Sequence, residues 1–342
     1  MKKLLLLTTG GTIAAHATAE GLAPDPDGAA LARRLTAVTE PYHVTIHAIL
    51  CLDSSNIQPE EWQFIAKSVF ELRTGFDGVV ITHGTDTMAY TASMLTFMLP
   101  GIDLPVVFTG SQLPISSPLS DAQENLRCAL AMAASGVPGV FLAFDRQVLL
   151  GCRAVKVRTT GFQAFESVNL PPVAEVSSDG LPVRRELIPC QQGPCRLEDT
   201  IDNRVALIKL IPGVDPQLFA AVAKLGCRGV VIEAFGSGGL HFIRRDLISA
   251  LGLLVMQGIS VVVCSQCLYE RSDMSAYEVG RRALEKGVIP AEDMTTEAAV
   301  TKLMWALGRC SSPKEVAALF ARSLAGEVSE PILRPEPKQS NP

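Results

Sequence analysis

No stretch of this sequence stays apolar over the roughly 20 residues that a membrane-spanning helix requires. The first apolar run, Leu4 to Leu7, ends after four leucines at Thr8. A signal peptide needs about 7–15 apolar residues and a small-residue cleavage site, so a buried first strand is the better interpretation. We therefore expect a cytoplasmic protein with no membrane partner.

Charge is also scarce. Asp, Glu, Lys and Arg together make up 19 % of the 342 residues, the formal net charge is −5, and no basic run occurs. This mild negative charge argues against a nucleic acid as the main partner. Hydrophobic residues make up 48 % of the chain, which is ample for a packed core and argues against global disorder.

The nine cysteines show no evenly paired framework of the kind that stabilises small secreted proteins. They are scattered through long apolar segments, so we expect reduced thiols, most of them buried. Cys264 and Cys267 form a C-x-x-C pair, but no second pair completes a zinc site. We therefore expect neither a metal nor another cofactor.

The length fits two domains better than one, at about 100–200 residues per domain. Short apolar runs alternate with amphipathic segments, which predicts an α/β protein whose parallel, Rossmann-like sheet is covered on both faces. In the first half we expect strands at Lys3–Thr8, Tyr42–Leu50, Gly78–Thr82, Val106–Thr109 and Val140–Phe144. The helices expected there are Gly28–Val38, Glu60–Leu72 (with Pro59 at its first position), Thr85–Met98 and Ser120–Ala134. A hairpin-like extension follows at Gln147–Lys156.

From Pro171 to about Arg196 the chain is rich in Pro, Ser, Gly and charge, as is typical of a linker. We place an N-terminal domain at residues 1–190, a linker at 191–204, a smaller C-terminal α/β domain at 205–330, and a flexible tail at 331–342. The strands expected in the second half are Val205–Leu210, Gly229–Glu233 and Ser260–Cys264. The helices expected there are Pro216–Leu225, Arg244–Met256, Ala276–Lys286 and Glu297–Leu307.

Three loops rich in hydroxyls and carboxylates follow predicted strands of the first half: Thr9–Thr12, Asp53–Asn56 and His83–Thr87. Ligands of open parallel sheets bind outside the carboxyl ends of the strands, so we expect these loops to meet at one edge. The glycines before Thr12 allow a tight turn that presents its hydroxyl to a ligand, although a plain strand-to-loop turn has the same composition. Neither a dinucleotide fingerprint nor a P-loop is present.

The loop His83–Thr87 has a structural and a functional interpretation. We expect Thr85 or Asp86 to cap the following helix, which leaves the other side chains free to face a ligand. His83 ends a buried strand, so a hydrogen-bonded structural role is favoured over that of a general base. Lys156 is either a solvated surface group or, if it is buried beside Asp86, a cation that helps to activate a neighbouring hydroxyl.

The loop Asp53-Ser54-Ser55-Asn56 could bind the charged head of a small ligand. It could equally form a capping box before Pro59 and Glu60. Both roles can hold, because four polar side chains exceed what one cap requires.

Two ungapped segments, Leu6–Ala14 and Gly78–Met88, resemble the two signatures of the asparaginase/glutaminase family. The resemblance extends from about Lys3 to about Glu330 and is strongest to the cytoplasmic type I bacterial L-asparaginases. Further segments agree with it: Asp53–Asn56, Met88–Ala92, Thr109–Gln112 and Asn169–Pro172.

The resemblance implies hydrolysis of L-asparagine to L-aspartate and ammonia through an acyl-enzyme, with L-glutamine as a second candidate substrate. It implies a homodimer or a dimer of dimers. Thr12 matches the nucleophilic threonine of a flexible lid, and Thr85, Asp86 and Lys156 match the family's second triad. The loop that holds the α-carboxylate and α-amino group of the substrate is matched by Asp53, Ser54 and Ser55, with Thr85 and Asp86 also in contact with the substrate.

The sequence departs from the family pattern at the lid, where Leu22 stands in place of the usual tyrosine. The C-terminal loop Gly236–Gly239 also lacks an asparagine that is often found there. One alternative is therefore a catalytically impaired amino-acid-binding protein. A second is the ammonia-generating component of a tRNA-dependent amidotransferase, which typically carries an added N-terminal domain, whereas this chain begins at its first strand.

Overall fold

The computed structural model describes residues 1–11, 13, 15–18, 21–24 and 39–329. For residues 15–18 and 21–24 it describes the backbone alone. Three predictions lie outside the described residues: the nucleophile Thr12, the helix Gly28–Val38 and the tail 331–342.

The N-terminal domain is built on a seven-stranded sheet in the order β11-β8-β7-β6-β5-β1-β4. The five strands from β7 to β4 are parallel, and β8 and β11 extend the sheet in antiparallel pairing. Their bounds are β1 Lys3–Gly10, β4 His43–Leu52, β5 Gly78–Thr82, β6 Pro105–Thr109, β7 Gly139–Phe144, β8 Gln147–Leu150 and β11 Ala174–Glu175. Every residue of β5, β6 and β7 is buried, as expected for parallel strands covered on both faces.

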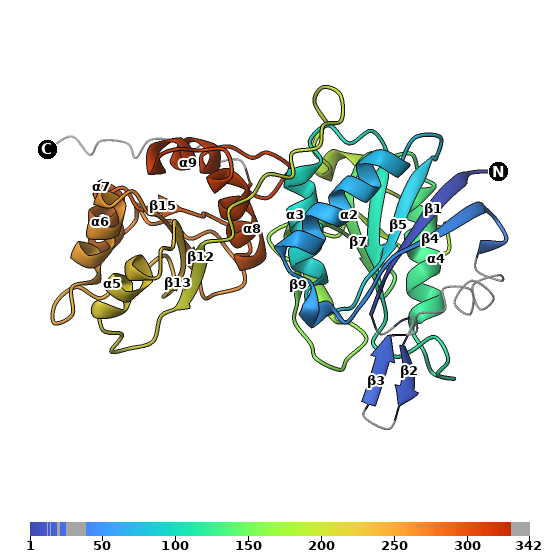
Figure 1. The fold of residues 1–342 in the computed structure, drawn as a ribbon, viewed down its shortest axis with the longest axis horizontal. Helices are drawn as coiled ribbons and strands as arrows, with labels where there is room; N and C mark the ends of the chain where they lie inside the picture. Colours follow the sequence, from blue (N-terminus) through green and yellow to red (C-terminus); the bar gives the residue numbers. More distant parts are fainter. Residues whose placement is uncertain (12, 14, 19–20, 25–38, 330–342) are drawn as a thin grey trace, which may run out of the picture.

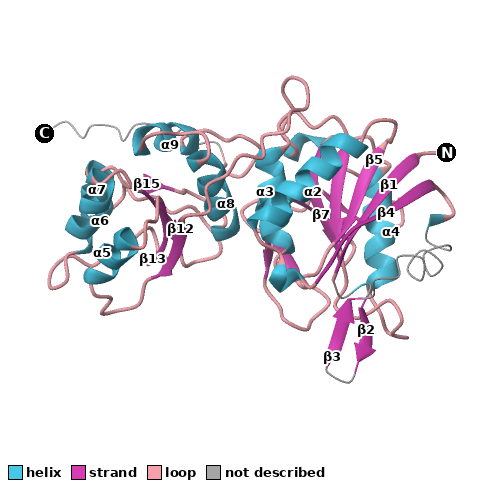
Figure 2. Ribbon diagram, in the orientation of Figure 1, coloured by secondary structure: helices cyan, strands magenta, loops and turns pink. Residues whose placement is uncertain are grey.

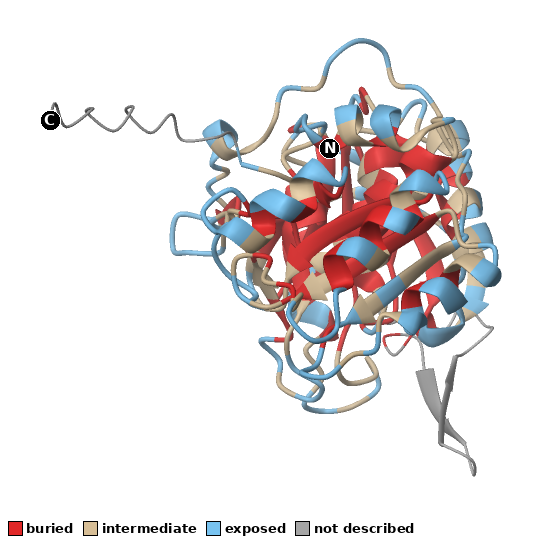
Figure 3. Ribbon diagram, turned by 90° about the vertical axis from the view of Figure 1, so that its left-hand side faces the viewer, coloured by how far each residue is buried: buried red, intermediate tan, exposed pale blue. Residues whose placement is uncertain are grey.

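Helices α2 (Pro59–Leu72) and α3 (Met88–Met98) cover one face of this sheet, and α4 (Ala122–Ala133) covers the other (Figure 1). Figure 3 shows the buried strands enclosed between helices whose outer turns are exposed. Pro59 begins α2, as predicted, and Gln58 forms a capping box with Glu61. The N-cap of α2 is therefore Gln58 and does not belong to the preceding polar loop.

The C-terminal domain has four parallel strands in the order β12-β13-β14-β15. The strands are β12 Val205–Lys209, β13 Gly229–Ala234, β14 Ser260–Ser265 and β15 Ile289–Pro290, and the helices are α5 Gln217–Lys224, α6 Leu247–Met256, α7 Glu278–Glu285, α8 Thr296–Leu307 and α9 Pro313–Phe320. Helix α8 packs on β12, β13 and β14 and also on α3, so it joins the two domains (Figure 2). The two-domain α/β architecture is confirmed.

Short elements complete the described part of the fold. The hairpin β2 (Ala15–Thr18) and β3 (Gly21–Pro24) projects from the main body (Figure 2), and β9 (Ala154–Lys156) pairs with β10 (Phe165–Ser167). The 3₁₀ turns are η2 Ser54–Asn56, η3 Gly151–Arg153 and η4 Arg185–Leu187. None of the helices in the described ranges has the length and hydropathy of a bilayer span.

The predicted strands are confirmed to within one or two residues at each end, but α3 and α6 begin three residues later than predicted. The sequence interpretation missed α9, although its signal is present. The Ser312 hydroxyl accepts a hydrogen bond from the amide of Glu315, and Pro313 opens the helix.

The proline-rich stretch that begins at Pro171 belongs in part to the N-terminal sheet, because β11 pairs with β8. Residues 188–204 carry no helix or strand, and the predicted linker 191–204 lies within them. The domain boundaries themselves stay a prediction.

The expectation that most thiols are buried is wrong. All nine cysteines are free, but Cys128, Cys152 and Cys264 alone are buried. Several of the others lie on an edge strand or in loops, where an apolar neighbourhood in the sequence does not produce burial in space. Cys267 is exposed while Cys264 is buried, so the two members of the C-x-x-C pair have different surroundings.

Two buried ion pairs hold the domains and the C-terminal segment together. Arg153 Nη1 lies 3.1 Å from the Asp293 carboxylate, and its Nε donates to Gly326 O at 2.7 Å. Lys302 on α8 donates to the Glu327 carboxylate at 2.5 Å, and neither side chain has any exposed surface. Burial lowers the pKa of Lys302, against the opposing effect of Glu327. Each member of these pairs depends on the other, because a single buried charge is strongly unfavourable.

We expect Lys302→Met to lower the free energy of unfolding by about 3–5 kcal/mol, because it leaves the Glu327 carboxylate buried without its counter-ion. Guanidinium titration followed by circular dichroism measures this loss. A second change, Glu327→Gln, should restore part of it by removing the orphaned charge. The matched control is Lys67→Met, which breaks the exposed pair with Glu71 and should cost about 0–1 kcal/mol. Equal unfolding midpoints for the two lysine variants would contradict this interpretation.

Candidate active site

The three polar loops meet at one edge of the N-terminal sheet, as predicted, because β5, β1 and β4 are neighbours. The backbones of these loops lie close to one another at this edge. Gly11 N donates to Leu52 O at 3.0 Å, and a Cβ on Gly11 would lie 2.4 Å from Gly84 N. Gly11 also has a φ of +78°, so a side chain at this position is excluded by space and by conformation.

Lys156 reaches this edge from β9. Its Nζ lies 2.8 Å from Thr85 Oγ1 and 2.6 Å from Asp86 Oδ1. The lysine side chain is 16 % exposed and the Asp86 side chain 64 % exposed, so the lysine is largely covered while its counter-ion is accessible to solvent. Of the two environments considered for Lys156, the structure therefore shows the one beside Asp86.

Neither Thr85 nor Asp86 caps the following helix, and that expectation is wrong. Helix α3 begins at Met88, and its N-cap residue, Thr87, makes no capping bond with its side chain. The reason is competition for the side chains. The Thr85 hydroxyl and the Asp86 carboxylate are held by Lys156, while the Thr87 hydroxyl donates to Ser54 O at 2.7 Å.

The loop after β4 contributes Asp53, Ser54 and Ser55. Asp53 Oδ1 accepts hydrogen bonds from Ser55 N at 2.8 Å and from Ser55 Oγ at 2.5 Å, so it caps the turn η2. Ser54 is buried, and its Oγ accepts a hydrogen bond from Asp86 N at 3.2 Å. Ser54 thus joins the loop after β4 to the loop after β5.

Gln112 is a member of the site that residue-by-residue reasoning missed. Its Oε1 accepts a hydrogen bond from Thr85 Oγ1 at 3.3 Å, and its Nε2 donates to Thr159 O and Gly161 O. The carbonyl oxygens can only accept, so they fix which end of the amide faces Thr85. A signal was available: Gln112 follows β6, the next parallel strand at the same edge.

His83 is a buried structural residue. Its Nδ1 lies 2.7 Å from Gly84 O and its Nε2 lies 3.0 Å from Thr91 Oγ1, so both ring nitrogens have partners. Burial lowers the pKa of His83 to about 4, which keeps the ring neutral at neutral pH. These contacts agree with the structural role favoured for it from the sequence.

Thr12 lies outside the described residues. Its described neighbours are Gly11, whose amide donates to Leu52 O at the end of β4, and Ile13, whose carbonyl accepts a hydrogen bond from Ile115 N. For Leu22 the structure describes the backbone alone, within β3.

In this site the hydroxyl oxygen of Thr85 accepts a hydrogen bond from the Lys156 ammonium group, and the Asp86 carboxylate is the counter-ion of that group. An aspartate and two serines lie on the neighbouring loop. The first set is suited to polarising a hydroxyl for nucleophilic or proton-transfer chemistry, and the second to binding a small charged ligand. The described residues contain no group of three or more metal-ligating side chains.

Comparisons with known proteins cover nearly the whole chain. Residues 3–189 match the family described as asparaginase, N-terminal, and residues 204–320 match the glutaminase/asparaginase C-terminal domain. An L-asparaginase of Thermococcus kodakarensis is 44 % identical over 96 % of this chain and 99 % of its own length. One component of the glutamyl-tRNA(Gln) amidotransferase of Pyrococcus furiosus is 36 % identical over 97 % of this chain and 78 % of its own length.

Solved structures that resemble this chain are also asparaginases. The thermostable L-asparaginase from Thermococcus kodakarensis has a TM-score of 0.89 at 42 % identity, covering 96 % of this chain and all of that chain. L-asparaginase I from Vibrio cholerae has a TM-score of 0.84 at 31 % identity, covering 96 % and 99 % of the two chains. Archaeal proteins are among these relatives, so the bacterial type I subgroup stays a prediction. The chain belongs to the asparaginase/glutaminase family of amidohydrolases.

Proposed function

We propose that this enzyme hydrolyses the side-chain amide of L-asparagine to L-aspartate and ammonia through a threonine acyl-enzyme. The observation that carries the proposal is the contact of Lys156 Nζ with Thr85 Oγ1 and Asp86 Oδ1, beside the loop of Asp53 and its serines. The 44 % identity to an L-asparaginase over almost the full length supports this substrate. A type I subgroup, a cytoplasmic location, and a homodimer or dimer of dimers remain predictions from the resemblance.

In the proposed reaction the charged head of asparagine binds to Asp53, Ser54, Ser55 and Asp86. The Thr12 hydroxyl attacks the amide carbon, a C–O bond forms, and the C–N bond breaks as the leaving nitrogen takes up a proton and departs as ammonia. Water then cleaves the ester and restores the threonine. Lys156 and Asp86 act through Thr85 to polarise the hydroxyl groups and move the proton.

Backbone donors of the turn before α3 stabilise the oxyanion in this scheme. The amide of Asp86 is engaged by Ser54 Oγ at 3.2 Å, so the amide of Thr85 is the better candidate. The absence of a lid tyrosine at Leu22 gives the polarised Thr85–Lys156 pair a larger share in activation.

Replacement of either threonine tests the mechanism. We expect Thr12→Ala and Thr85→Val each to lower kcat for asparagine by at least about 10³-fold, because members of one catalytic unit cannot substitute for each other. Ammonia release from asparagine and from glutamine measures this loss. Thr96→Val is the matched control, since Thr96 bonds within α3 to Ala92 O and should retain full activity.

Two outcomes would contradict the proposal. Unchanged turnover by Thr12→Ala would remove Thr12 as the nucleophile. If the wild-type protein binds L-aspartate in calorimetry but releases no ammonia from asparagine, it is an amino-acid-binding protein. The kinship with a component of a tRNA-dependent amidotransferase makes a third result informative: ammonia release that requires an added tRNA-dependent partner would favour that role.

Gln112 gives a second test, of the orientation of the Thr85 hydroxyl. Lys156 donates to Thr85 Oγ1, so the threonine's own proton is directed to Gln112 Oε1. We expect Gln112→Met to lower kcat about tenfold or more with little change in KM, because a small misorientation of a reacting group is costly. Gln112→Glu loses both Nε2 bonds and sets an oxygen against two carbonyl oxygens, but it keeps an acceptor for Thr85. Because this acceptor orients the reacting hydroxyl, we expect Gln112→Glu to retain more activity than Gln112→Met.

The control for this pair is Gln63→Met, which removes the bond from Gln63 Nε2 to Asp199 O, a bond that involves none of the site residues. Steady-state kinetics on asparagine separates kcat from KM for all three variants. Equal losses in Gln112→Met and Gln112→Glu would show that the amide acts only as a clamp on residues 159–161.

A further inference from the structure

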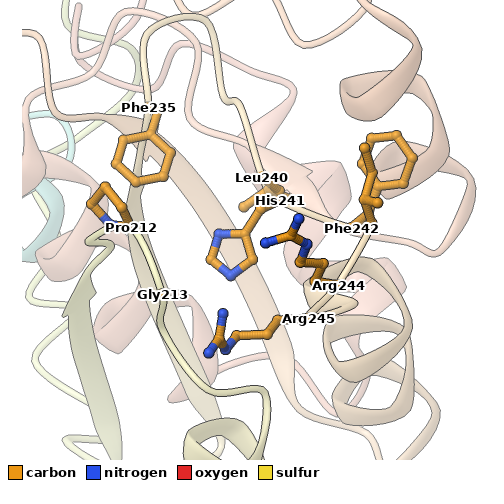
Figure 4. A pocket seen from close by; sticks show the side chains of 9 residues that line it. Pro212, Gly213, Phe235, Leu240, His241, Phe242, Arg244 and Arg245 are labelled. Carbon is orange, nitrogen blue, oxygen red and sulfur yellow. The ribbon is translucent and has the colours of Figure 1, made fainter.

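A hollow of about 520 Å³ opens at the carboxyl ends of β12 and β13 in the C-terminal domain (Figure 4). Pro212 and Gly213 line it from the segment after β12, and Phe235 with residues 240–245 lines it from the segment between β13 and α6. It shares no residue with the candidate active site. The volume lies within the range typical of small-molecule sites.

One part of the hollow is apolar. Phe235, Leu240 and Pro212 form this part, and Leu240 is almost fully buried. Phe242 also lines the hollow and carries the guanidinium of Arg282 over its ring at 4.7 Å. Such walls suit the hydrocarbon body of a ligand.

The other part is cationic. His241, Arg244 and Arg245 line the hollow, and Figure 4 shows the imidazole ring between the two guanidinium groups in that view. Within the described ranges no carboxylate lines it. Among the described residues neither guanidinium has a hydrogen-bond or ion-pair partner, whereas Arg204 and Arg228 both pair with Asp202.

The late start of α6 makes this arrangement possible. Asp246 caps the helix through Ser249 N at 3.0 Å, so the two arginines precede the helix, in a bend of the chain. The only carboxylate next to them in the sequence is thereby engaged in the cap. His241 Nε2 donates to Val214 O at 3.1 Å, and this bond holds the imidazole ring at the wall of the hollow.

We propose that this hollow binds a small organic anion that consists of a carboxylate joined to an aromatic or aliphatic body. The two guanidinium groups line the same hollow without a described counter-ion, and an anion there gains charge-assisted hydrogen bonds from them. Guanidinium groups bind carboxylates in a planar, bidentate manner, which selects this head group. Phe235 and Leu240 take the body. The hollow shares no residue with the candidate active site, so ligand binding to it can be measured apart from ammonia release, and its test does not rest on the proposed function.

Three probes distinguish the parts of the hollow. Phenylacetate carries an anion and a ring, phenethylammonium carries the same ring with the opposite charge, and acetate carries the anion alone. We expect phenylacetate to bind with a Kd on the order of 1 mM, as a ligand of about ten heavy atoms allows, and the other two at least about tenfold more weakly. The readout is the ring-proton shift of His241 in NMR, assigned among the five histidines through the variant His241→Gln.

Two variants locate the anion. Arg244→Gln and Arg245→Gln should each weaken phenylacetate binding about tenfold, the usual effect of losing one charge-assisted hydrogen bond. Arg127→Gln, on the exposed side of α4, removes the same charge elsewhere and should leave binding unchanged.

The opposite results would overturn the proposal. Equal binding of phenylacetate and phenethylammonium would show a hydrophobic surface without anion selectivity. Equal weakening in Arg127→Gln would show a general charge effect. Absence of any His241 shift, together with a change of oligomeric mass in Arg245→Gln, would show that a second copy of the chain covers the hollow instead.

Discussion

The contact of Lys156 with Thr85 and Asp86 is the interaction on which the candidate active site depends. It joins β9 to the turn that follows β5, and these two segments are about 70 residues apart in the chain. A largely covered ammonium group needs a counter-ion and hydrogen-bond acceptors, and the site supplies one of each. The lysine therefore organises the site, and in the proposed mechanism it also polarises the Thr85 hydroxyl.

The position of β9 is set by interactions elsewhere in the molecule. Arg153, immediately before β9, is buried and binds Asp293 and Gly326 O in the C-terminal segments. On the other side of Lys156, Gln112 holds residues 159–161. The C-terminal domain thus contributes to the site without placing a described residue in it.

Close backbone contact imposes the second constraint. A Cβ on Gly11 would lie 2.4 Å from Gly84 N, and a Cβ on Gly84 would lie 2.6 Å from Ser54 Oγ. The loops after β1, β4 and β5 can meet only because glycine stands at these positions. The lysine and the glycines act together: the glycines bring the loops within hydrogen-bonding distance, and the lysine fixes the orientation of Thr85 and Asp86.

The sheet and its polar edge could be predicted from the sequence, because buried β-branched runs and the carboxyl-end rule are local and general. The start of α3 could not be predicted. Local propensity favours a helix cap by Thr85 or Asp86, but in the structure both side chains bind Lys156 on β9 instead. The environment of Lys156 and the clamp by Gln112 depend on contacts between distant segments, which no local pattern encodes. Helix α9, which the sequence interpretation missed, could have been predicted from the capping residue Ser312 and the proline that follows it.

The position of bound product tests the central claim most directly. In a crystal soaked with L-aspartate, we expect the α-carboxylate and α-amino group on the loop of Asp53 and its serines and on Asp86. The side-chain carboxylate should lie within hydrogen-bonding distance of Thr85, whose hydroxyl is held by Lys156, and of Thr12. Electron density for aspartate with its side chain directed away from Thr85, or at another place in the molecule, would contradict the account.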